Sequence, residues 1–218
     1  MTNDNWTKLF LDLLPGLGVS LQLTAGLLAI GLPLGLLLAV GISSKDKIVR
    51  YPAVAVVEVG RGVPALVLLY LVYFGLPQTG ITLDAMPAAM IGLGVSFAAY
   101  TSEVFRAGIQ SVPQGQTEAG KALGMSGGVI FGKVVMPQAL KIVVPPLLGW
   151  AVIYFQATSL AFALAVPELL SRAYVLATTN FQYLNMLSLA AMLYAGVAIP
   201  LTVLAEHSSR RDAKSRTA

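Results

Sequence analysis

Apolar residues along the chain fall into long runs that short polar segments separate. Because a helix needs about 20 apolar residues to cross the hydrocarbon of a bilayer, each of five runs is long enough for one crossing. The pattern therefore predicts an all-α integral membrane protein with five transmembrane helices. The predicted spans are residues 16–42, 52–76, 88–110, 142–166 and 184–205.

The second run is less regular than the other four. Glu58, Arg61 and Pro64 interrupt it, so we expect its first third to lie along the inner membrane interface and the chain to cross from about Val63. Glu58 and Arg61 stand three residues apart and are expected to form an ion pair on one helix face.

Three glycines in the first predicted span, Gly26, Gly31 and Gly35, recur at spacings of five and four residues. The second spacing puts Gly31 and Gly35 on one helix face. Because glycine carries no side chain, a neighbouring helix can approach closely there, and we expect these residues to be packing residues.

Basic residues are distributed unevenly among the polar segments. The segment 43–51 carries three basic residues against one acidic residue, which favours the cytoplasmic side of the membrane. Five spans then place the N-terminus outside and the C-terminus inside, with only Lys8 and Arg172 of the fourteen basic residues on the outer side. The other twelve are Lys45, Lys47, Arg50, Arg61, Arg106, Lys121, Lys133, Lys141, Arg210, Arg211, Lys214 and Arg216.

Composition agrees with a membrane protein. The chain is 56% hydrophobic and 11% charged, whereas soluble domains are about 45–50% apolar and about 25% charged. The net charge of +4 does not indicate nucleic-acid binding, because the basic residues lie mainly at span ends. We divide the chain into an N-terminal interfacial segment, 1–15, a transmembrane domain, 16–206, and a basic cytoplasmic tail, 207–218.

A polar, glycine-rich stretch, 112–141, separates the third and fourth spans. Residues 115–125 contain helix formers, with Glu118 suited to the positive N-terminal end of a short helix and Gly124 as its stop. A second, amphipathic segment leads to Pro137, which punctuates the run before the next span. A small helix that stands clear of the membrane can enter a groove of another protein, so we interpret this loop as a docking element.

The spacing in this loop resembles the EAA loop of ABC importer permeases: Glu-Ala-Ala, three residues, Gly, nine residues, then Ile-x-Leu-Pro. The chain has Glu118-Ala119-Gly120, Gly124 and Val134-Val135-Met136-Pro137 at the same spacing, with small or apolar replacements at three positions. Further blocks resemble the polar amino acid uptake family, and the resemblance covers residues 15 to 206. These blocks are Arg61-Gly62-Val63-Pro64, Glu103-Val104-Phe105-Arg106-Ala107-Gly108-Ile109, Met136-Pro137-Gln138-Ala139 and Pro145-Pro146-Leu147.

The resemblance implies a permease subunit of an ATP-driven importer for a polar amino acid, located in the inner membrane of the cell. It implies a second permease, identical or homologous, two cytoplasmic ABC ATPases and an external substrate-binding protein. The EAA loop, about 113–140, would couple the permease to the ATPases. The implied coupling residues are Glu118, Ala119, Gly120, Ala122, Leu123, Gly124 and Pro137.

Residues 115–121 also match a phosphate-binding loop, Gly, four residues, Gly-Lys, up to its last position. That position is Ala122, which lacks the hydroxyl that would bind the magnesium ion, and a membrane span rather than a buried strand precedes the loop. We therefore expect ATP and magnesium to be bound by the partner ATPases, and no cofactor by this chain.

The fourth predicted span carries a polar cluster, Gln156, Thr158 and Ser159, which is costly in a membrane unless it faces protein or a wet cavity. Members of the resembling family usually have an aspartate where this chain has Ala157. Two alternatives follow. Either a homologous partner subunit carries the carboxylate and binds the substrate, which we favour, or the three polar residues hold the substrate here. Hydrogen bonding between helices is a competing explanation.

Charged residues near span ends have simpler explanations. Glu103 and Arg106 stand three apart in the third span and are expected to pair, although Tyr100 and Glu103 are also candidates to approach a substrate cavity. Glu168 and Arg172 stand four apart and suggest a short external helix with an ion pair.

Two other classes of protein are considered. An intramembrane hydrolase would need a serine and a histidine together in the bilayer, but the one histidine, His207, lies at the inner edge of the last span, far from Ser96. A stand-alone secondary transporter would show internal repeats, and none is visible in five spans.

Overall fold

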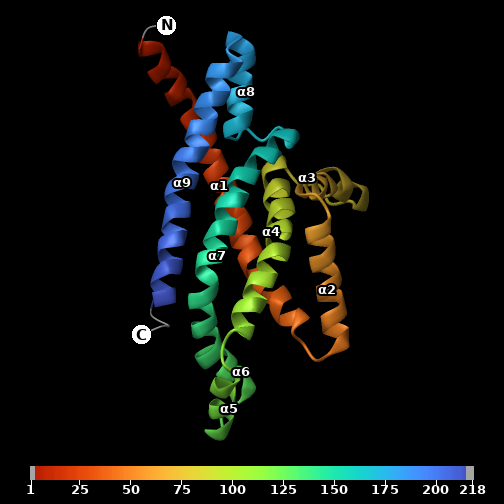
Figure 1. Cartoon of the computed structure of the whole chain (residues 1–218). Helices are drawn as coiled ribbons and strands as arrows, with labels where there is room; N and C mark the ends of the chain where they lie inside the picture. Colours follow the sequence, from red (N-terminus) through yellow and green to blue (C-terminus); the bar gives the residue numbers. More distant parts are fainter. Residues whose placement is uncertain (1–2, 215–218) are drawn as a thin grey trace.

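The computed structural model describes residues 3–214, and every regular element in that range is helical (Figure 1). The predicted all-α membrane fold is confirmed. Arg216 and the rest of 215–218 lie outside the described residues. The α-helices are α1 (Asn3–Ile42), α2 (Lys47–Gly62), α3 (Ala65–Tyr70), α4 (Ala85–Gln110), α5 (Gln114–Ala122), α6 (Gly127–Ile130), α7 (Met136–Ala157), α8 (Leu169–Asn180) and α9 (Tyr183–Lys214). Shorter elements are π-helical turns at Leu71–Gly75 and Phe131–Val135 and 3-10 turns at Leu76–Thr79 and Thr158–Leu164.

Four helical stretches are long and apolar enough to cross a membrane: Trp6–Ile42, Ala85–Gln110, Gly127–Leu164 and Tyr183–His207. The fifth predicted span is a pair of helices, α2 and α3 with its following turns, which meet at an angle of 110°. The first span is longer than expected, since α1 passes through Pro15 without a break. No structural boundary therefore separates the predicted interfacial segment from the first span.

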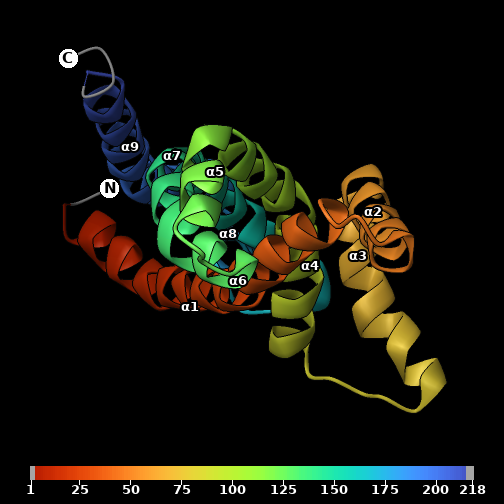
Figure 2. The same cartoon turned by 90° about the horizontal axis from the view of Figure 1, so that it is seen from below.

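The path of the second span differs from the prediction. α2 runs beside α1 and the lower half of α4, whereas α3 turns away sideways after Val63 (Figures 1 and 2). The hydroxyl of Tyr100, the sixteenth of 26 residues in α4, donates to the carbonyl of Arg61 at 3.1 Å. Arg61 therefore lies beside the middle of α4, not at the interface. Within the described residues no ion pair joins Arg61 to Glu58, so that prediction was wrong.

The polar segments gather at two ends of the bundle. The α1–α2 turn, the α5–α6 region and the C-terminal end of α9 lie at one end, and α8 and the start of α1 lie at the other (Figure 1). The end that carries α5 and α6 is the one that the distribution of basic residues assigns to the cytoplasm. That assignment stays a prediction, and Arg61 no longer contributes to it.

α4 is the central helix and contacts α1, α2, α3 and α7. The three glycines at positions 26, 31 and 35 of α1 face it: Gly26 lies against Met90, Gly31 against Phe97, and Gly35 against Thr101. A methyl group on Gly31 would come within 2.8 Å of the carbonyl oxygen of Gly94. These residues are therefore packing residues, and their small size sets the distance between the two helices.

Glu168 joins three helices at the end of the bundle opposite α5. Its side chain is fully buried and caps α8 by accepting from the amides of Leu170 and Ser171 at 2.9 and 2.7 Å. It also accepts from the hydroxyl of Tyr194 in α9 at 2.7 Å and from that of Ser20 in α1 at 3.5 Å. Buried carboxylates are stable only when such donors surround them.

The predicted ion pair between Glu168 and Arg172 was wrong. The carboxylate of Glu168 turns back to cap its own helix, and Arg172 points instead to α1, where its Nε donates to the carbonyl of Asp12 at 2.7 Å. Both side chains fix α8 against α1. The prediction of a short helix here is confirmed, but the sequence did not indicate how that helix is held in place.

We expect Glu168→Ala to lower the stability of the protein, because it removes a helix cap and leaves buried donors of α8, α9 and α1 without an acceptor. The cost should be about 2–4 kcal/mol. Thermal unfolding of the purified protein in detergent measures it. Tyr194→Phe removes one of these bonds and should cost less, and Glu206→Ala, at an exposed position of α9, should cost nothing. Equal melting temperatures for Glu168→Ala and Glu206→Ala would contradict the anchoring role.

Candidate coupling surface and pathway pocket

The predicted docking helix is present as α5, Gln114–Ala122, and stands at the end of the molecule (Figure 1). It ends as the sequence indicated: Gly124 has a φ of +74°, a backbone conformation that glycine adopts without strain. The amide of Gly124 donates to the carbonyl of Lys121 at 2.9 Å, and that of Met125 to Gly120 at 3.1 Å. These two bonds form a Schellman motif, which fixes the turn after the helix.

Residues 115–121, which match most of a phosphate-binding loop, lie inside this helix. A phosphate-binding loop instead exposes successive backbone amides in a wide turn between a strand and a helix. The backbone of residues 115–121 is helical instead. The sequence matches a phosphate-binding loop, but the backbone conformation does not.

Gly120, the position where the resembling loop has alanine, packs against the next segment. It is the one buried residue of α5, and a methyl group there would lie 2.8 Å from Cγ1 of Ile130. Ile130 belongs to a small apolar cluster with Val112, Val135 and Ala139. Glycine therefore lets α5 lie directly on α6, and this cluster holds the two helices together.

The other predicted coupling residues face away from this cluster. Glu118, Ala119, Ala122 and Gly124 are exposed, as is Pro137 at the start of α7. Leu123 is 81% exposed. An apolar side chain held outward at the end of a helix leaves apolar surface in water, and a partner protein that covered this surface would gain free energy. Leu123 therefore forms an exposed apolar tip at the end of α5, and the small residues Ala119, Ala122 and Gly124 lie near it in sequence.

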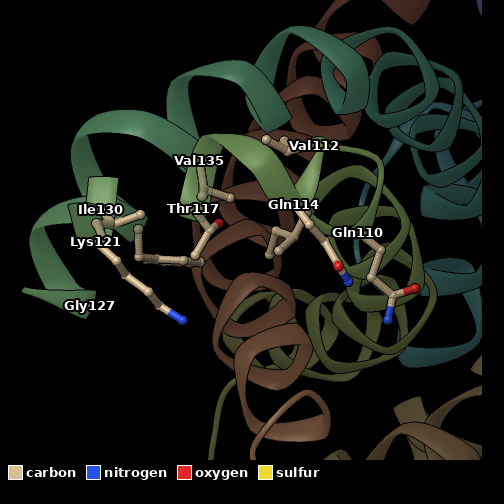
Figure 3. A pocket seen from close by; sticks show the side chains of 10 residues that line it. Gln110, Val112, Gln114, Thr117, Lys121, Gly127, Ile130 and Val135 are labelled. Carbon is tan, nitrogen blue, oxygen red and sulfur yellow. The ribbon is translucent and has the colours of Figure 1, made fainter. Parts of the chain in front are cut away.

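A groove of about 620 Å³ runs along the other side of the docking helix. Figure 3 shows Gln114, Thr117 and Lys121 of α5 at this groove together with Ile130 and Val135 of the following segment. Gln110 at the end of α4 also lines it. None of the predicted coupling residues does, so the groove and the exposed tip are different faces of the same unit.

The second half of the docking loop is not a separate amphipathic segment. Helical structure continues from Gly127 through a π-helical turn, Phe131–Val135, into α7 and on to Leu164. Pro137 lies inside this continuous helix, just after the π-helical turn, and has no amide to donate to the preceding turn. The proline therefore marks the place where the helix changes its winding rather than an interruption.

A second cavity, of about 420 Å³, lies beside the middle of α4, and we name it the aromatic pocket. Its walls come from α4, α7 and the break between α2 and α3. Tyr100 stacks on Trp150 with ring centroids 4.7 Å apart, and the hydroxyl groups of Ser96 and Tyr154 share a hydrogen bond of 2.8 Å. The lining residues are Arg61, Gly62, Val63, Pro64, Ala65, Ser96, Tyr100, Trp150, Ile153, Tyr154 and Ala157.

The predicted pathway residues are only partly at this pocket. Tyr100 lines it, but Glu103 instead accepts from Nε of Arg106 at 2.9 Å, which confirms the expected ion pair. Thr158 and Ser159 donate to carbonyls of their own helix at 2.6 and 2.9 Å. These contacts lie within the helix and begin a 3-10 turn. A pathway role for these two residues and Gln156 stays a prediction.

Sequence reasoning missed Trp150, Tyr154 and Arg61 as pocket residues. The spacing of Trp150, Tyr154 and Ala157, four and three residues, puts them on one helix face, and this signal was available. Contact between that face and Arg61 was not foreseeable, because it depends on the 110° break after α2.

Comparison with known proteins places this architecture in a family. Residues 31–211 match the family described as binding-protein-dependent transport system inner membrane component. The probable amino-acid ABC transporter permease protein YckA of Bacillus subtilis is 36% identical over 192 residues, 86% of this chain and 85% of its own. The arginine transport system permease protein ArtQ of the same organism is 31% identical over 200 residues, 91% of each chain.

Solved structures agree. A chain from the crystal structure of an amino acid ABC transporter with histidines has a TM-score of 0.83 and 31% identity, covering 95% of both chains. A chain of the MetNI methionine ABC transporter in an inward-facing conformation has a TM-score of 0.75 at 20% identity, covering 97% of this chain and 99% of its own, which shows the shared fold.

These matches exclude the two other classes considered from the sequence, an intramembrane hydrolase and a stand-alone secondary transporter. Ser96, the serine of the first class, is already bonded to Tyr154 in the pocket wall. The chain belongs to the family of binding-protein-dependent transport system inner membrane components: it is the permease subunit of an ABC importer, a multi-pass protein of the inner membrane and not an enzyme.

Proposed function

We propose that this chain forms half of the translocation pathway of an ATP-driven amino acid importer and is coupled to its ATPases through the tip of α5. The substrate class rests on relatives whose names state amino acids, including the arginine permease ArtQ and the glutamate/aspartate import permease GltK of Escherichia coli. The coupling role rests on one observation, the outward position of Leu123 at a rigid helix end.

The complete importer needs further subunits. We propose a second permease, identical or homologous, two cytoplasmic ATPases that bind ATP and magnesium, and an external substrate-binding protein. The chemistry of ATP hydrolysis would then lie entirely in the partners, and this chain would convert their closure into movement of its helices.

The direction of the chain follows from the same proposal. The turn at Lys45 and Lys47, the docking helix with Lys121, and the C-terminal end of α9 share one end of the bundle (Figure 1). A concentration of basic residues at one end favours the cytoplasm, where ATP is. The binding protein would then meet the opposite end, near α8.

We expect Leu123→Ser to weaken attachment of the ATPase without harming the permease, because Leu123 already lies in solvent within its own chain. Loss of one buried leucine from an interface should weaken binding by about tenfold or more. The amount of ATPase that copurifies with a tagged permease measures it, and Leu123→Met, which keeps an apolar side chain, should restore it. Unchanged copurification for Leu123→Ser would refute the anchor.

We also expect Gly124→Ala to impair coupling, because a side chain at a φ of +74° strains the turn by about 1–2 kcal/mol. Uptake per ATP hydrolysed, in proteoliposomes that contain the whole importer, should fall. Gly128→Ala is a matched control, since nothing lies within 4 Å of the added methyl group and its φ is ordinary. If both variants couple as the wild type does, the turn has no role in coupling.

A further inference from the structure

We propose that the turn between α1 and α2 binds an anionic phospholipid, in the membrane leaflet at the end of the bundle that carries α5. The turn comprises residues 43–51 and the first helical turn of α2, and we name it the basic turn. This inference concerns the lipid around the permease. It does not depend on the transported substrate or on the ATPase.

Three cations of the basic turn have no carboxylate partner. Lys45, Lys47 and Arg50 are all exposed, and no ion pair joins any of them to a carboxylate within the described residues. Asp46 is the one acidic residue of the turn. Its Oδ1 already accepts from the amide of Ile48 at 2.9 Å and so caps α2. The basic turn therefore presents three cations against a single carboxylate that is already bonded.

The helix itself does not account for these charges. Lys47 and Arg50 lie in the first turn of α2, which carries no acidic residue. The positive end of the helix dipole disfavours cations at that position. Charges that are unfavourable within their own helix are stabilised by an anion from outside the chain.

An apolar stripe on α2 shows what surrounds the basic turn. Ile48, Val56 and Val59 are 82%, 45% and 57% exposed, and their spacing puts them on one side of the helix. The opposite side of α2 buries Ala53 and Val57 against α1 and α4. The exposed stripe thus faces lipid, and it ends at Ile48, directly beside the cations. The acyl chains of a lipid that covers the stripe place its headgroup at the basic turn.

The basic turn lies at the membrane surface and not on the docking helix. In Figure 1 it is level with the end of α4, whereas α5 and α6 stand beyond both. Tyr51, a residue type enriched at membrane interfaces, lies under the guanidinium of Arg50, 5.4 Å from the ring centroid. Ammonium and guanidinium groups donate strongly to phosphate oxygens. An anionic lipid is favoured over a zwitterionic one because each basic residue near the surface adds to the attraction.

The chain has no cysteine, which permits a local measurement. In the purified importer complex, Ile48→Cys carries a small fluorophore that nitroxides quench, and emission from the complex without this cysteine is subtracted. The bilayer is phosphatidylcholine with an equal fraction of nitroxide-labelled phosphatidylglycerol or phosphatidylcholine. We expect labelled phosphatidylglycerol to associate at least about threefold more strongly, and high salt to remove most of this preference.

Two triple variants of the labelled complex separate charge from shape. Lys45→Gln, Lys47→Gln, Arg50→Gln removes three charges and should abolish the preference for phosphatidylglycerol. Lys45→Arg, Lys47→Arg, Arg50→Lys keeps the charges and should retain it. If the neutral variant does not assemble, the salt series on the labelled complex decides, because a preference that high salt leaves unchanged contradicts a charge-based site.

Three other results would overturn the proposal. The first is equal quenching by the two lipids, and the second is a preference that survives neutralisation of the three cations. The third is a label that neither lipid quenches until the ATPase is removed, since the basic turn would then be an ATPase contact.

Discussion

The closeness of α1 to α4 is the constraint on which the rest of the structure depends. Lipid gives no hydrophobic drive for two apolar helices to associate, so packing must hold them together. Gly31 and Gly94 bring the two backbones near enough that an added methyl group would collide with a carbonyl oxygen. With this contact fixed, α4 presents its other faces to α2, α3 and α7, and those faces define the aromatic pocket.

Local chemistry explains why α5 and the turn after it could be predicted from the sequence. Helix formers and a terminal glycine act within a few residues of each other, and the turn after α5 is made by the expected Gly124. Glu118 was expected at the N-terminal end of this helix, but it is the fifth of nine residues and lies outside the first turn. The pair of Glu103 and Arg106 was predictable for the same reason, since both lie on neighbouring turns of one helix.

Features that depend on distant parts of the chain could not be predicted in this way. Glu168 and Arg172 satisfy the spacing rule for an ion pair, yet Glu168 caps its own helix and accepts from Tyr194 of α9. Arg172 bonds instead to Asp12 of α1, 160 residues away in sequence. The position of Arg61 could not be predicted either, because it depends on the break after α2. The hydrogen bond from Tyr100 to the carbonyl of Arg61 places that residue beside the middle of α4. Spacing rules assume that a helix is alone, and a packed helix bundle offers competing partners.

The unbroken helical path from Gly127 to Leu164 has a mechanical consequence. Its 38 residues make a rod about 57 Å long, with α6 at one end and Trp150 and Ala157 toward the other. A tilt of about 5° at one end of such a rod displaces the far end by about 5 Å, more than the diameter of a water molecule. Transmission of such a tilt requires the π-helical turn at Phe131–Val135 to stay stiff, because this turn lies between α6 and the rest of the helix.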